Sequence, residues 1–248
     1  MKSVIYVYLV MQFLGAESKS LYDALNPCHM SDPDFKTCYL NFLNRGIALV
    51  NNEIPGFKVP FTNPYKISST NIDLNIENLG SANGTFKNIK VTNAFKVKIN
   101  NIKYDLENLI FEYNLTHPKI SAEAEFVLDG KLFSTSAHVE GSIKGKLTLV
   151  NSNIRLKYKI VERRGIKYFA VDDFKLQMYV GDAAVHIISN NPEEQPILDI
   201  IQNMFNQDAR LYLDMLNPIY VERVETLVVR PLLDAALYII PADKLLLK

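Results

Sequence analysis

Residues 217–240, NPIYVERVETLVVRPLLDAALYII, decide how the remaining chain has to fold. Their apolar side chains recur at three- and four-residue steps in two neighbouring stripes, as on a helix. A narrow polar stripe is formed by Arg223, Thr226, Arg230 and Asp234. A helix that is apolar around most of its circumference has to be buried on most sides. Asn217-Pro218 either begins this helix or kinks a longer one, and Pro231 predicts a bend.

Upstream of this segment, between Tyr65 and about Ile188, apolar residues alternate with polar ones, which predicts strands. The alternation is clearest at residues 72–76, 95–99, 109–115, 124–128, 154–160 and 174–180. Turn signals separate these runs at 79–84, 128–131 and 162–165. Strands with one apolar face and one solvent-exposed face are typical of antiparallel sheets.

These parts predict an α+β fold in which a highly curved antiparallel β-sheet wraps the long C-terminal helix. An N-terminal helix, with an apolar stripe from Phe35 to about Ile54, precedes the strands. The concave face of such a sheet is larger than one helix can cover. Periodicity alone leaves open whether side chains fill the remaining space or whether it is a cavity.

The first residues have the features of a secretory signal peptide, which we assign to residues 1–18. Lys2 supplies the positive charge, and the apolar run 4–14 is too short to span a bilayer. Residues 19–248 then form a single domain of a secreted, extracellular protein. The sequons at Asn83 and Asn114 are candidate glycosylation sites that fit this location.

Both cysteines of the chain, Cys28 and Cys38, lie immediately around the start of the N-terminal helix. Because a secreted chain folds in an oxidising compartment, we expect them to form a disulfide. A pair this close in sequence cannot join distant parts of the fold, so it fixes a local structure.

Several functions are disfavoured by the composition. Lys and Arg number 27, as do Asp and Glu, and the sequence ERR at 162–164 is the most basic cluster, so nucleic-acid binding and electrostatic attachment to an anionic membrane are poor candidates. Known catalytic motifs are absent, so we expect neither an enzyme nor a cofactor. The four histidines are scattered, so we expect no metal site.

The order of several short motifs resembles the takeout and juvenile hormone-binding protein family of insects, over almost the whole mature chain. The matching segments are CHMSDPDFKTCYLNFLNRGI, NNEIPGFKVPFTNP, FVLDGKLFSTSAHVEGSIKGKLTLVNSNIRLKYKI and NMFNQDARLYLDMLNPIYVERV, with YIIPADKLLL at the end. The single cysteine pair favours the takeout branch, because the hormone-binding branch usually carries a second disulfide. The chain departs from the family in having no tryptophan after LN, where Tyr220 lies nearby. The resemblance implies a long helix inside a curved sheet, with the N-terminal helix at one end and an elongated apolar tunnel for a lipid-like ligand. It also implies that the disulfide stiffens a gate at that end.

On this basis the sequence predicts a secreted, monomeric carrier of a terpenoid, a fatty acid or another lipid-like molecule. The predicted tunnel-lining residues are Phe42, Phe95, Phe111, Tyr113, Phe126, Tyr158, Met178, Val228 and Leu232. For each of them, plain core packing is the alternative interpretation. A second hypothesis is an interaction protein with a filled core, whose surface contacts a receptor or, transiently, a membrane.

Overall fold

The computed structural model describes residues 27–51, 63–76, 80–132 and 135–245. In these residues one antiparallel sheet has the strand order β1-β2-β4-β5-β6, and β3 pairs with the other half of β4. The strands are β1 (Tyr65–Ile76), β2 (Gly80–Thr92), β3 (Lys98–Asp105), β4 (Ile110–Leu132), β5 (Thr135–Arg163) and β6 (Ile166–Ser189). The predicted signal peptide, and Ile54 at the end of the predicted first helix, lie outside the described residues.

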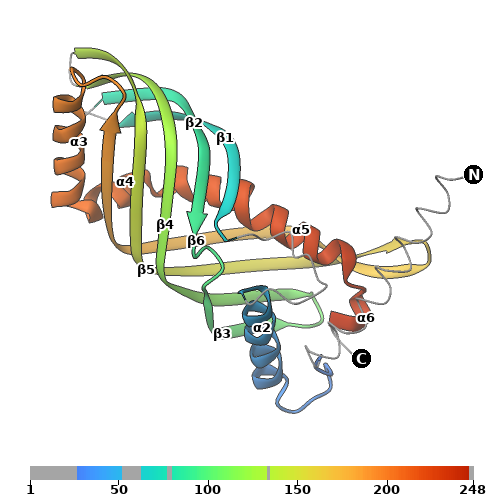
Figure 1. Ribbon diagram of the computed structural model, residues 1–248. Helices are drawn as coiled ribbons and strands as arrows, with labels where there is room; N and C mark the ends of the chain where they lie inside the picture. The colour runs from blue at the N-terminus through green and yellow to red at the C-terminus, as the bar shows by residue number, and fades with distance from the viewer. Residues whose placement is uncertain (1–26, 52–62, 77–79, 133–134, 246–248) are drawn as a thin grey trace, which may run out of the picture.

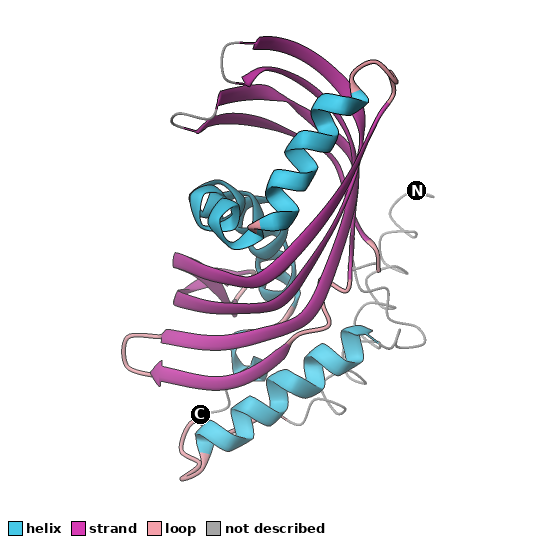
Figure 2. Ribbon diagram, turned by 90° about the vertical axis from the view of Figure 1, so that its left-hand side faces the viewer, coloured by secondary structure: helices cyan, strands magenta, loops and turns pink. Residues whose placement is uncertain are grey.

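The sheet curls around a long helical segment, as predicted (Figures 1 and 2). This segment consists of α4 (Ala209–Val224), the π-helix η1 (Glu225–Val229) and α5 (Arg230–Ile239), which follow one another without a break. The other helices are α2 (Phe35–Asn51), α3 (Gln195–Gln207) and α6 (Ala242–Leu245). Helix α2 packs on β3 at one end of the sheet, and α3 covers the other end (Figure 1). No helix in the described part of the chain is long and apolar enough to cross a membrane.

The two prolines of the long helix have different effects. Asn217-Pro218 is a position inside α4 and not its start, because Asp208 caps the helix and its carboxylate accepts a hydrogen bond from the N–H of Leu211 at 3.2 Å. Pro231 has no N–H to donate to the carbonyl of Leu227, one turn earlier. The Tyr65 hydroxyl donates to that carbonyl instead, at 3.1 Å, and the π-helical turn η1 lies where the sequence predicts a bend.

The turn signals in the sequence are only partly right. The turn at 162–165 is confirmed, with Arg164 and Gly165 at positive φ. The expected turn at 128–131 is wrong, because these residues continue β4, so the apolar runs 109–115 and 124–128 belong to one strand of 23 residues. The expected turn at 79–84 is also wrong from Gly80 onward, because β2 begins there.

The concave face of β4 changes phase in the middle of the strand. Phe111 and Tyr113 are buried on it in the first half, and Phe126 is buried in the second half, where the even-numbered residues face inward. Between the halves, Leu149 of β5 has φ 53° and Pro118 of β4 lies opposite it. A strand residue at positive φ, such as Leu149, turns the side chains that follow it to the other face of the strand. The sheet is thereby divided into two differently oriented halves.

The outer edge of β6 is covered by side chains of the helices. Asn206 of α3 accepts from the N–H of Val185 and donates to its carbonyl, both at 2.8 Å, and Gln202 accepts from the N–H of Ile187 at 2.8 Å. Further bonds to this edge come from Gln195, Arg210 and Asn217. These side chains replace a neighbouring strand, and they fix α3 and α4 against the sheet.

Buried side chains form three clusters along the concave face. The α2 cluster contains Phe35, Tyr39, Phe42, Phe111, Tyr113, Leu156, Phe169 and Phe174. The α4 cluster contains Val150, Val180, Ala183, Ala209 and Leu213. The α3 cluster contains Phe126, Val139, Ile187 and Leu198.

Candidate functional site

An apolar cavity with a volume of about 280 Å³ adjoins the α3 cluster, between the concave face of the sheet and helices α3 and α4. Its sheet wall is formed mainly by Leu74, Phe86, Phe126, Leu128, Ala137, Val139, Ile143 and Ile187. Its helix wall is formed by Ile197, Leu198, Ile201, Met204, Phe205, Tyr212 and Leu216. The cavity is thus lined by elements that extend along the chain from β1 to α4.

Strand alternation explains the sheet wall. Phe126 and Leu128 are alternate residues of β4, so the pleat places both on the concave face. Gly141 lies opposite Phe126 on β5, and a Cβ atom there would lie 3.0 Å from Cζ of the Phe126 ring. Because Gly141 has no side chain, the Phe126 ring can lie over the backbone of β5 at this position.

Helix α3 supplies the cover of the cavity. Ile201 follows Ile197 by four residues and Leu198 by three, so the three side chains lie on one side of the helix. The amide side chains that bind β6 lie beside this face and hold it toward the sheet. The orientation of α3 is therefore set by hydrogen bonds to a strand edge as well as by apolar packing.

The chemistry of the cavity is that of a hydrocarbon binding site. Ser81, Lys131 and Tyr212 are the lining residues with polar side chains, and Lys131 is exposed at the end of β4. The described residues contain no group of three or more His, Cys, Asp or Glu side chains that could hold a metal ion. This lining can exclude water from an apolar ligand, and its few polar groups can fix an orientation.

Of the predicted tunnel residues, Phe126 lines this cavity. Phe42, Phe111, Tyr113 and Tyr158 lie together elsewhere, in and against the α2 cluster. Phe111 is 0% exposed, and its ring centroid lies 5.7 Å from that of Tyr158. These residues are therefore packed against one another at the opposite half of the sheet.

The α2 cluster also contains a chain of buried phenol groups. The hydroxyl of Tyr113 lies 3.5 Å from that of Tyr39 and 3.4 Å from that of Tyr158. Burial raises the pKa of all three tyrosines above the ordinary value, because the charged phenolate would lose its hydration. The hydroxyls therefore stay protonated and bond to one another inside an aromatic core.

The remaining predicted residues occupy separate places. Phe95 is half-buried, and its ring meets that of Tyr65 edge-on at 5.9 Å. Met178 packs against the α4 cluster. Val228 of η1 and Leu232 of α5 are half-buried on the long helix and do not line the cavity.

None of the residues of the helix wall was predicted to line the site. They could have been found from the run of Ile, Leu, Met and Phe in α3, whose apolar stripe is as clear as that of the first helix. Leu74 and Phe86 were also missed, although both follow the alternation of their strands. Nothing in the sequence indicated that these residues face one another across a space.

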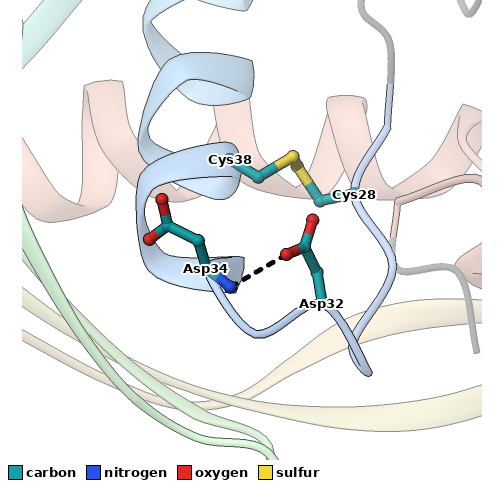
Figure 3. Close-up of a disulfide and its surroundings, with 4 residues drawn as sticks. All are labelled: Cys28, Asp32, Asp34 and Cys38. Carbon is teal, nitrogen blue, oxygen red and sulfur yellow. Dashed lines mark hydrogen bonds between the residues drawn. A yellow bond between two sulfur atoms is a disulfide. The ribbon is translucent and has the colours of Figure 1, made fainter.

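The predicted disulfide is confirmed: Cys28 and Cys38 are bonded, with their Cα atoms 5.9 Å apart (Figure 3). Asp32 lies in the loop that they close, and its carboxylate accepts a hydrogen bond from the N–H of Asp34 at 2.8 Å. Cys28 is 2% exposed in the α2 cluster. The disulfide therefore fixes the start of α2 at the end of the sheet remote from the cavity.

The two sequon asparagines differ in their surroundings. Asn83 is exposed on β2. Asn114 is half-buried on β4, and its amide donates to Asn153 at 2.9 Å and accepts from Asn100 at 3.1 Å. Glycosylation at either position stays a prediction.

Comparison with known proteins gives a family and a fold. The family model described as haemolymph juvenile hormone binding protein (JHBP) matches residues 7–247. The crystal structure of Epiphyas postvittana Takeout 1 superposes with a TM-score of 0.69 at 14% identity, covering 90% of this chain and 99% of that chain. A crystal structure of lipopolysaccharide binding protein gives a TM-score of 0.27 at 13% identity, over 68% of this chain and 35% of that one. No curated protein sequence matches the chain.

Proposed function

Because this chain belongs to the haemolymph juvenile hormone binding protein family, we propose that it is a secreted carrier whose ligand binds in the cavity under α3. The observation that carries the proposal is this cavity of about 280 Å³, whose walls are almost entirely apolar. Its ligand is a hydrophobic small molecule, such as a fatty-acyl or terpenoid chain. Binding without catalysis is the whole of the proposed activity.

The physical basis of binding is the removal of hydrocarbon from water. Each buried CH₂ group contributes about 0.8 kcal/mol, so a chain of about ten carbons gains roughly 8 kcal/mol. Part of this is offset by the lost motion of the ligand and of the side chains that close over it. A gain of about 8 kcal/mol without any offset corresponds to a dissociation constant of about 1 μM. After the offset such a chain should therefore bind more weakly than this, and longer ligands or ligands that also use the polar groups at the rim should bind more tightly.

Secretion is supported by two independent features. The disulfide between Cys28 and Cys38 requires an oxidising compartment to persist. The apolar segment within residues 1–18 has the pattern of a signal peptide, although it lies outside the described residues. The domain that remains is residues 19–248.

The experiment is native mass spectrometry of the purified protein, combined with titration of a fluorescent fatty probe. We expect a co-purified lipid or saturable probe binding in wild type. Ala137→Phe places a ring into the cavity and should abolish both, while Ala184→Phe, on an exposed position of β6, serves as the matched control.

Two outcomes would count against the carrier. Wild-type protein without a lipid and without probe binding would favour the interaction protein with a filled core. Equal probe binding by wild type and Ala137→Phe would place the ligand outside this cavity.

A further inference from the structure

The hairpin between β5 and β6 ends in a tip, residues 160–168, that projects beside the C-terminal helices at the far side of the molecule from α3 (Figure 1). Ile160 is 53% exposed and Ile166 is 47% exposed at this tip. Tyr238, at the end of α5, lies next to it and is 63% exposed. Two aliphatic side chains and one aromatic ring are thus presented to solvent at a protruding point.

The tip is also cationic. Residues 162–167, ERRGIK, contain three cations and one carboxylate. Among the described residues, neither Arg164 nor Lys167 forms an ion pair with a carboxylate. Arg164 lies in the turn itself, at positive φ, and is exposed.

Immediately before the tip, the cations of the same hairpin are paired with carboxylates across the strands. Lys157 and Lys159 both pair with Asp172, at 3.4 Å each, and Arg155 pairs with Asp173 at 3.2 Å. Neutralisation across the strands therefore stops where the exposed apolar residues begin. The tip itself carries three cations against one carboxylate, although the chain as a whole is balanced.

Arg163 joins the tip to the C-terminal helix. Its guanidinium lies 4.4 Å from the ring centroid of Tyr238 and 5.2 Å from that of Tyr168, and it donates to the Tyr238 carbonyl at 3.3 Å. The exposed ring of Tyr238 is therefore held in place, so little conformational freedom is lost when it contacts a partner.

We propose that this tip docks on an anionic phospholipid bilayer. Arg164 and Lys167 would contact the headgroups, and Ile160, Ile166 and Tyr238 would enter the interfacial layer. Unpaired cations next to exposed aliphatic and aromatic side chains match the two forces that hold proteins at such a surface, namely attraction to anionic lipid and burial of apolar area. The exposed apolar residues of α3 and α4 do not form a comparable surface for an anionic bilayer, because the carboxylates of Asp199, Asp208 and Asp214 lie among them.

The docking surface does not depend on the proposed carrier function. The cavity lies at the start of β5, which contributes Ala137 and Val139, and the tip lies at the end of the same strand, at Arg163. A protein that bound no lipid internally could still dock, and a carrier could fail to dock. The two proposals therefore fail independently.

The test is co-sedimentation of the full chain with phosphatidylcholine vesicles that contain about one-third phosphatidylserine, against vesicles of phosphatidylcholine alone. We expect binding to the anionic vesicles that weakens as salt is raised. Each cation near the surface strengthens binding about fivefold, so Arg164→Gln with Lys167→Gln should lower the partition coefficient about 25-fold. Ile166→Ser should lower it about tenfold, because an apolar anchor is lost.

The matched control is Lys144→Gln with Lys146→Gln, which removes the same charge from exposed positions of β5 remote from the tip. It should change vesicle binding less than about twofold, because these charges lie beyond a Debye length from the docked surface. Equal loss in control and tip variants would overturn the proposal, as would equal binding to both kinds of vesicle. Binding to heparin without vesicle binding would also overturn it and assign the tip to an acidic polysaccharide.

Discussion

Truncation of Phe111 to alanine should destabilise the protein strongly without changing ligand binding. The side chain is 0% exposed, and its ring centroid lies 5.6 Å from that of Tyr39 and 5.7 Å from that of Tyr158. Removing a fully packed phenylalanine costs about 3–5 kcal/mol, and the lost ring contacts place this site near the upper end of that range. For a chain of this size the melting temperature should fall by roughly 10–20 °C.

Phe126→Ala should destabilise the protein less than Phe111→Ala but should change ligand binding more. This ring is 4% exposed and meets Phe86 edge-on at 6.3 Å, but its other side faces the cavity. A side chain with an empty space beside it makes fewer contacts, so its loss should cost only about 2–3 kcal/mol. Because the cavity becomes larger and changes shape, affinity for a long fatty probe should change by at least about fivefold.

The assay is thermal unfolding and fluorescent fatty-probe titration on both variants. Glu112→Ala is the control next to Phe111, since its carboxylate is exposed on the outer face and lies 4.0 Å from Arg155. Such a surface pair contributes at most about 1 kcal/mol, so stability should hardly change. A small loss of stability with a large loss of probe affinity in Phe111→Ala would refute the reasoning, because it would place the ligand in the α2 cluster.

Three further predictions concern the disulfide, a histidine and the sequons. Replacing both cysteines with serine should lower the free energy of unfolding by roughly 2.5–3 kcal/mol, measured by denaturant titration, because a short loop is no longer closed in the unfolded chain; an unchanged midpoint would contradict this. Hydrogen bonds to Asp129 and then to Glu140 raise the pKa of His138, so any stabilisation is present at acidic pH and is lost as pH rises through the folded pKa; Asp129→Asn should lower this pKa in an NMR titration, and an unshifted curve would argue against the contact. Peptide mapping of protein secreted by insect cells should show glycan at exposed Asn83 more than at hydrogen-bonded Asn114, and two bare sites would remove this support for secretion.

The local elements could be predicted because each one leaves a period in the sequence. Alternation indicated the strands, and three- and four-residue steps indicated α2 and the long helix. The failures at 79–84 and 128–131 have one cause: Gly and Asn favour turns, but strand pairing on both sides kept Gly130 extended. Local preference was overridden there by hydrogen bonds to distant residues.

The candidate site could be predicted only in part. Alternation correctly placed Phe111 and Phe126 on apolar faces of their strands, and both are buried. It could not show that α2 packs over the first and that a cavity lies beside the second. The alternation within one strand decides which side chains face inward. Whether such a side chain is packed or lines a cavity depends on which other element lies over the strand at that point.

The sequence by itself determined most of the strands, helix α2, the long helix, the disulfide and the need to bury residues 217–240, but not β2 or the full length of β4. The tertiary structure alone decided where space remains and where charge accumulates. The reason is that cavities and ion pairs depend on distances between residues far apart in the chain. Lys157 is neutralised because pairing of β5 with β6 brings Asp172 to 3.4 Å, whereas among the described residues no carboxylate forms an ion pair with Arg164. A balanced composition therefore produces a cationic surface wherever the register leaves a charge unpaired.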